Sequence, residues 1–169
     1  MAQINLQKVP ASYHTYVQLV TEDNLQTAFK NYSQEIISLL KGIPAEKWDY
    51  RYAEGKWSIK ELIQHVIDAE RIFCYRALTF ARKDEKVLPG FDENHYAEVS
   101  KADRRTPQDL IEELEAVQNS SARLFASFDE EQLQAEGSAN NKNIYVEGIG
   151  FVIIGHCRHH KKVLLERYL

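Results

Sequence analysis

Cysteine is scarce in this sequence, which holds only Cys74 and Cys157 among its 169 residues. A disulfide framework needs more cysteines than this, and the two fit a reducing compartment. The first ten residues, MAQINLQKVP, contain no apolar segment of the kind that a secretory signal requires. We therefore expect a cytoplasmic protein in which both cysteines are packing residues.

Long hydrophobic runs and clusters of basic residues are also missing. The longest apolar stretch, GIGFVIIG, covers residues 148–155, whereas a membrane-spanning helix needs about 20 such residues. Adjacent basic residues occur only as short pairs, such as Arg104–Arg105 and Lys161–Lys162, and the formal net charge is −4. Because binding to nucleic acid needs clustered Lys and Arg, we expect neither nucleic acid nor a membrane as a partner.

Three enzyme motifs are absent as well: a glycine-rich phosphate loop, the G-x-S-x-G nucleophile motif and CxxC. Nucleotide binding and serine or dithiol chemistry therefore have no support in the sequence. What is present is an ordinary globular composition, with 44% hydrophobic and 27% charged residues. The length suits one domain, residues 1–169, with one sizeable core.

Four long segments carry the apolar spacing of helices, and no strand-like alternation of comparable length occurs. The second has the clearest start, because Ser58 and Glu61 form a capping box, and the third starts at Thr106 with Pro107 in the first turn. The polar stretch QAEGSANNKN reads as a loop. We predict an all-α four-helix bundle with helices over about residues 21–41, 58–81, 106–128 and 145–169, and a short extra helix over 13–20.

Histidines interrupt the apolar seam of the last predicted helix. Residues three and four apart share a helix face, and this face carries Ile149, Ile153, His156, His160, Val163 and Arg167. The H-x-x-x-H spacing lets imidazoles on successive turns converge on one ion. His159 lies nearer the edge of the seam and is an alternative to His160.

A third metal ligand is expected from another helix. His65 shares an inward face with Leu62, Ala69 and Ile72, so the second and fourth helices would have to be neighbours. Three neutral imidazoles suit zinc, nickel, iron(II) or copper, and leave a coordination position open for water or substrate. Asp68, close to His65 in sequence, is a candidate base or outer partner.

The same histidines have simpler interpretations. Each can be a core residue satisfied by a hydrogen bond, in which case the protein binds no metal. Alternatively, a metal could tie the two helices together without catalysis. Asp68 can likewise be an ordinary salt-bridged helix residue.

Three segments of the sequence, taken together, resemble the DinB/YfiT-like superfamily, in particular its DinB_2-type branch. They are GKWSIKELIQHVIDAERIFCYRALTFARKD, LPGFDENHYA and IIGHCRHHKKVLLERYL. The resemblance runs from the first helix to the C-terminus. It implies a four-helix bundle with a divalent metal, zinc or nickel, held by His65, His156 and His160, and it implies a homodimer.

The family includes S-transferases that use low-molecular-weight thiols, and members described only as metal-dependent hydrolases. The resemblance therefore implies a metal-dependent transferase or hydrolase that acts on a small-molecule substrate, with a thiol or water activated at the metal. The long connection over residues 82–105 would contact substrate through Asp92, His95 and Tyr96 if it covers the site.

Overall fold

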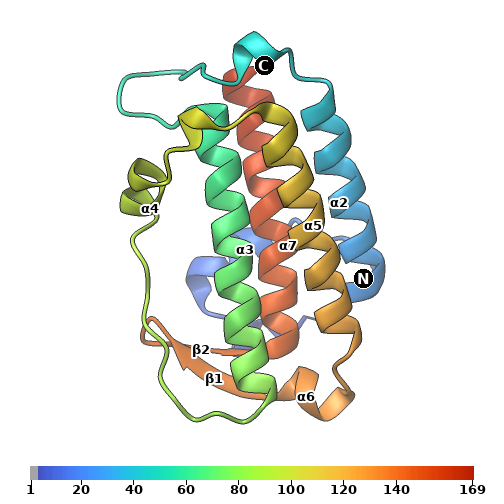
Figure 1. Cartoon of the computed structure of the whole chain (residues 1–169). Coiled ribbons are helices and arrows are strands. Elements are labelled where there is room, and N and C mark those ends of the chain that lie inside the picture. The colour runs from blue at the N-terminus through green and yellow to red at the C-terminus, as the bar shows by residue number, and fades with distance from the viewer. Residues whose placement is uncertain (1–3) are drawn as a thin grey trace.

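Four long helices dominate the computed structural model, which describes residues 4–169 (Figure 1). They are α2 (Leu25–Lys41), α3 (Ile59–Ala81), α5 (Pro107–Ala126) and α7 (Val146–Val163), which continues into a π-helical turn, Leu164–Tyr168. The shorter elements are α1 (His14–Val17), α4 (Glu93–Val99), α6 (Glu130–Gln134), β1 (Glu136–Ala139) and β2 (Lys142–Tyr145). No helix among the described residues is long and apolar enough to cross a membrane.

The helix starts follow the capping residues of the sequence. Ser58 and Glu61 form the predicted capping box, each side chain bonding the other residue's backbone N–H. Thr106 caps α5 by accepting from the backbone N–H of Asp109. The first long helix begins later than predicted, at Leu25, because Asn24 provides its cap by accepting from the Thr27 backbone N–H.

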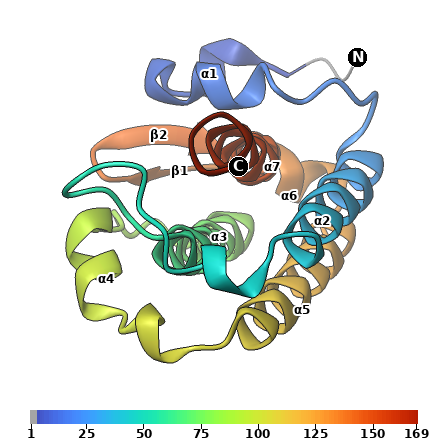
Figure 2. The ribbon, with the colours of Figure 1, turned by 90° about the horizontal axis from the view of Figure 1, so that it is seen from above.

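The order of the helices around the bundle differs from their order in the chain. Helix α3 packs against α5 and α7, and α2 packs against the same two helices. Figure 1 shows α2 and α7 running one way and α3 and α5 the other, and Figure 2 shows their positions from above. The α2–α3 and α5–α7 connections therefore cross the ends of the bundle diagonally. The long connection after α3 returns along the outside, carrying α4.

A short hairpin forms where the sequence predicted a loop. Strands β1 and β2 pair antiparallel, with Ala139 opposite Lys142. The two residues between them, Asn140 and Asn141, both have positive φ angles, which the tight turn of a hairpin requires and which asparagine tolerates. The backbone N–H of Leu88 donates to the carbonyl of Ser138 at 2.9 Å, so the outer connection is tied to this hairpin.

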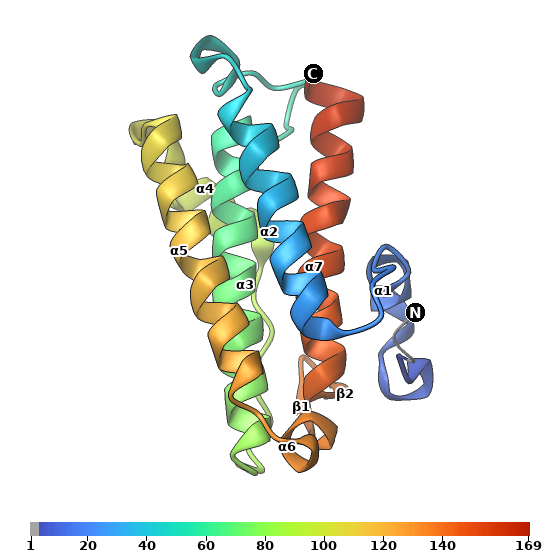
Figure 3. The same cartoon turned by 90° about the vertical axis from the view of Figure 1, so that its right-hand side faces the viewer.

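The N-terminal segment lies along the outer face of α7 (Figure 3). The predicted short helix is present as a 3-10 turn, Ala11–Tyr13, followed by α1. The approach is close: a Cβ on Gly155 would lie 2.1 Å from the carbonyl oxygen of Tyr16. Arg158 fixes the segment further by donating to the Leu19 carbonyl at 3.0 Å and to the carboxylate of Glu22.

The core between the four helices contains one buried acid. Glu70 on α3 is 2% exposed and accepts a hydrogen bond of 2.8 Å from the hydroxyl of Tyr32 on α2. Its second carboxyl oxygen has no partner. Both cysteines are free and pack nearby, Cys157 buried and Cys74 half-buried.

Candidate metal centre

Helices α3 and α7 bring three histidines together, as their predicted inward faces require. His65 lies in the second turn of α3, and His156 and His160 lie one turn apart on α7. His65 and His156 are each 7% exposed. Ligand nitrogens of all three rings lie within 4.8 Å of one another. Among the described residues they form the one group of histidines, cysteines and acids with this proximity.

The contacts between the rings cannot all be good hydrogen bonds. His156 Nε2 lies 3.1 Å from His65 Nε2 and 3.0 Å from His160 Nε2. A neutral imidazole nitrogen has a single in-plane position, which holds either a hydrogen or a lone pair. His156 Nε2 can therefore bond well to only one of its two neighbours. A single cation that accepts all three lone pairs removes the conflict.

The spacing of the nitrogens suits a divalent ion. Zinc–nitrogen bonds of about 2.0–2.1 Å in tetrahedral geometry place ligand nitrogens about 3.3 Å apart. The two measured separations, 3.0 and 3.1 Å, are close to this value. Three imidazoles also suit the borderline metals of the sequence prediction and leave a position open for another ligand.

Burial keeps the three imidazoles neutral. It lowers the pKa of His65 to about 4, and it holds the pKa of His156 and of His160 well below the usual value, helped by the neighbouring histidines. A neutral ring keeps the lone pair that a metal needs. The other ring nitrogen of His160, Nδ1, is buried without a hydrogen-bond partner.

Aromatic side chains enclose the histidines. The ring of Trp57 lies 4.7 Å from that of His65, between centroids. The Tyr168 hydroxyl holds the Trp57 residue by donating to its backbone carbonyl at 2.7 Å. On the other side Tyr16, from the N-terminal segment, meets the ring of His156 edge-on at 5.4 Å.

A cavity of about 310 Å³ opens beside the three nitrogens, a volume suited to a small molecule. Along α3 its wall is formed by His65, Ala69, Phe73 and Arg76. The opposite walls come from the N-terminal segment, the loop before α3, α7, the outer connection and the hairpin turn. They contribute Tyr13, Tyr16, Trp57, His156, His160, Phe91, Glu93 and Asn140.

Two other predicted site residues lie outside this group. The ring of His159 contacts Tyr16 at 5.3 Å and His160 at 5.2 Å, between centroids, and it does not join the three nitrogens. Asp68 accepts a hydrogen bond of 3.0 Å from Gln64 and does not line the cavity. A role for Asp68 as a base stays a prediction without a contact to support it.

The outer connection does reach the cavity, but through different residues from those expected. Phe91 and Glu93 line it. Of the expected residues, Asp92 caps α4 by accepting from the backbone N–H groups of Asn94 and His95, and Tyr96 packs on Phe91 at 5.2 Å. The sequence reasoning also missed Arg76, although it stands eleven residues after His65, three turns along the same helix face.

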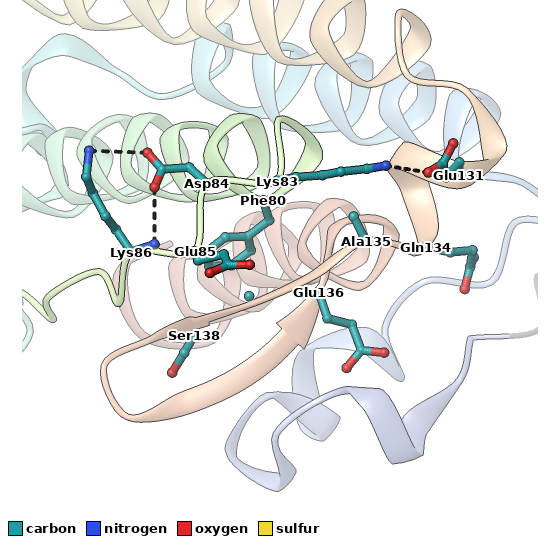
Figure 4. Close-up of a pocket in the computed structure, with 11 residues that line it drawn as sticks. Phe80, Lys83, Asp84, Glu85, Lys86, Glu131, Gln134, Ala135, Glu136 and Ser138 are labelled. Atoms are coloured by element: carbon teal, nitrogen blue, oxygen red, sulfur yellow. Dashed lines mark hydrogen bonds and ion pairs between the residues drawn. The ribbon is translucent and has the colours of Figure 1, made fainter.

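A larger hollow of about 630 Å³ lies near the end of the bundle, under the hairpin (Figure 4). Its charged side chains largely pair with one another, Lys83 with Glu131 and Lys86 with Asp84. It contains no histidine, and it shares no lining residue with the histidine cavity. The chemistry of the candidate site therefore belongs to the smaller cavity.

Comparison with known proteins adds a family to this geometry. Among solved structures the chain is similar to YfiT from Bacillus subtilis, described as a probable metal-dependent hydrolase with an unusual four-helix bundle topology. The TM-score is 0.73 at 15% sequence identity, over 85% of this chain and 83% of that chain. No curated protein matches the chain.

A likeness at this identity carries the fold alone, so the family rests on the sequence itself. The family model of the DinB superfamily matches residues 28–164. That range contains most of the four-helix bundle and all three clustered histidines. The protein therefore belongs to the DinB superfamily.

Proposed function

We propose that the protein is a metal-dependent enzyme in which His65, His156 and His160 hold one divalent ion, zinc or nickel. The observation that carries this proposal is the convergence of three Nε2 atoms, 3.0 and 3.1 Å from the central one, beside a cavity. A bound ion of this kind lowers the pKa of a water or thiol enough to supply a nucleophile near neutral pH. The residues around it bind and orient the substrate.

The walls of the cavity favour a catalytic role over a purely structural one. A structural metal is closed by four protein ligands, whereas this group offers three. Trp57 and Tyr16 shield the histidines from two sides, and the cavity leaves the third side accessible. A non-catalytic site that ties α3 to α7 is the alternative, because binding to the folded state alone would stabilise the protein.

The reaction is either hydrolysis, with water as the nucleophile, or transfer to a low-molecular-weight thiol. The description of YfiT as a probable metal-dependent hydrolase supports the first, and the family resemblance supports the second. Both act on an electrophilic small molecule. A homodimer in the cytoplasm remains part of the proposal, and light scattering of the purified protein checks the dimer.

Metal content tests the site directly. Purified tag-free protein, reconstituted with zinc or nickel and measured by inductively coupled plasma mass spectrometry, is expected to hold about one equivalent per chain. His65→Ala and His156→Ala each remove one nitrogen of the group and should lose the metal. His95→Ala is the matched control, because His95 is an exposed histidine that does not line the cavity.

Loaded protein is then screened against ester and amide substrates, and against electrophiles with small thiols. Activity that disappears in His65→Ala but persists in His95→Ala supports the enzyme. Wild-type protein that takes up no metal contradicts the proposal. Protein that binds metal but converts no substrate in either screen favours the non-catalytic alternative.

A further inference from the structure

Arg76 differs from every other described arginine. It is 5% exposed, yet none of the ion pairs among residues 4–169 involves it. The other arginines either pair with a carboxylate or are exposed. The paired ones are Arg51, Arg71, Arg105 and Arg158, and the exposed ones are Arg82, Arg104, Arg123 and Arg167.

The protein satisfies only part of the Arg76 guanidinium. One nitrogen, Nη2, donates to the carbonyl of Pro89 at 3.1 Å, and the group lies 5.6 Å from the ring centre of Phe73. Among the described residues, no acceptor takes a hydrogen bond from Nε or Nη1, and neither nitrogen is among the fully buried unsatisfied atoms. Because Arg76 lines the cavity, these donors are available to a molecule inside it.

A buried guanidinium without a counter-charge is costly, since its charge has been removed from water. Glu93 is the one carboxylate among the lining residues, but it is exposed at the start of α4 and makes no ion pair with Arg76. The missing negative charge is therefore expected from outside the chain. A guanidinium binds a carboxylate with two parallel hydrogen bonds, which makes an organic acid a fitting partner.

The distance between Arg76 and the histidines indicates how long the bound acid would be. His65 and Arg76 are eleven residues apart on one face of α3, which corresponds to about 16 Å along the helix axis. Between them lie Ala69, whose small side chain leaves space, and the ring of Phe73. The cavity thus has nitrogen ligands at one end, a cation at the other and an apolar wall between them.

We propose that Arg76 is the anion-binding residue of this cavity, and that the substrate is a small organic acid with an apolar body. Its carboxylate binds Arg76 while its reacting group lies at the histidines. This deepens the proposed function and rests on it for the reacting end alone, because the charge recognition by Arg76 needs no metal.

Two pairs of probes, each pair alike in shape and different in charge, test the proposal by calorimetric titration. Zinc-loaded protein receives mercaptohexanoate or mercaptohexanol, whose thiol can bind the metal. Metal-free protein receives phenylbutyrate or phenylbutanol, which have no strong metal-binding head. In both forms we expect the wild type to bind the carboxylate about tenfold to a hundredfold more tightly than the alcohol, as a charge-assisted hydrogen bond implies.

Arg76→Gln should bring the carboxylate down to the affinity of the alcohol, while leaving the alcohol within about twofold of its wild-type affinity. Arg76→Lys keeps the charge and should keep part of the preference. Arg82→Gln is the matched control, because Arg82 also lies near an aromatic ring, 5.7 Å from the centre of Phe128, but outside the cavity. It should bind both probes as the wild type does.

The titrations can contradict the anion site in three ways. Equal affinity of wild type for carboxylate and alcohol in both forms overturns the proposal, as does the absence of any binding. Equal weakening of both probes by Arg76→Gln shows that Arg76 only holds the connection at Pro89, and overturns it too. A charge preference in metal-free protein that takes up no zinc supports the anion site while the metal proposal fails.

Discussion

At the scale of single residues, two of the places where polar side chains enter the interior have consequences that can be measured. The three histidines meet between α3 and α7. Glu70, on another side of α3, faces α2 and the centre of the bundle. The proposed shared cation would account for the histidines. Glu70 accepts from the Tyr32 hydroxyl while its second oxygen has no hydrogen-bond partner, and burial favours the protonated acid over the carboxylate.

The buried acid makes stability depend on pH. Burial raises the pKa of Glu70 from 4.5 to about 7. Between these values the unfolded chain releases the proton and the folded protein retains it, so stability is full below about pH 4.5 and falls as the pH rises to about 7. Glu70→Gln stays neutral at every pH, so we expect it to avoid about 2–3 kcal/mol of the stability that the wild type loses over this range.

Urea unfolding of wild type and Glu70→Gln at pH 5 and pH 8 measures the effect. The gap between the two proteins should shift in favour of the variant at the higher pH. Glu46→Gln, at an exposed glutamate, is the control and should follow the wild type. Parallel pH profiles for wild type and Glu70→Gln would show that Glu70 titrates as an ordinary surface acid.

At the scale of elements, α7 carries both the histidines and the surface that receives the N-terminal segment. Gly155 directly precedes His156, and its missing side chain lets the Tyr16 backbone lie against the helix. Tyr16 in turn forms a wall of the cavity. The glycine thus links the packing of the N-terminal segment to the shape of the site.

We expect Gly155→Ala to destabilise the metal-free protein by about 2–3 kcal/mol, because the added Cβ meets backbone atoms that cannot rotate away. The free energy of unfolding in urea measures this. At Gly42 a Cβ would meet its nearest atom, the Leu39 carbonyl oxygen, at 3.4 Å. Gly42→Ala should therefore stay within about 0.5 kcal/mol of wild type. Equal effects of the two substitutions would contradict the close approach.

The elements with local signals were predictable, and those fixed by distant contacts were not. Helix α3 was predicted in full, because the residues that cap it and the residues of its apolar face lie in one continuous segment of the sequence. The hairpin was missed, because EGSANNKN has too few apolar residues for an alternating pattern. The local signal available was the Asn140–Asn141 pair, which suits the turn.

In the candidate site, too, only the residues with a local signal were predictable. The three histidines could be picked out from helix spacing, since each stands on an inward face of its own helix. The walls could not, because Phe91 and Tyr16 reach the cavity only through the path of the outer connection and the N-terminal segment. Arg76 shares the His65 face, but spacing alone does not reveal that it lacks a counter-charge.

At the scale of the whole molecule, metal binding is expected to stabilise the fold. An ion at a hundred times its dissociation constant contributes about 2.7 kcal/mol, which corresponds to roughly 5–10 °C in the unfolding temperature of a protein of this size. Removal of the metal by a chelator should lower the unfolding temperature of wild type by this amount. His65→Ala, which lacks one ligand, should show no change.

Differential scanning calorimetry before and after chelation and dialysis gives the comparison. Restoring zinc should restore the original temperature in the wild type alone. An unfolding temperature that changes neither on chelation nor on addition of zinc would indicate that the histidines are ordinary core residues. It would contradict both a structural and a catalytic metal site.

The diagonal connections of the bundle have a consequence for how the chain folds. His65 and His156 are 91 residues apart in sequence, and they meet only after both connections have crossed the ends of the bundle. Contacts between such distant segments form late and slowly. In the proposed metal site, the third ligand, His65, would therefore join His156 and His160 late in folding. A metal bound at that stage would hold α3 and α7 together in the completed fold, and it would slow unfolding more than it speeds folding.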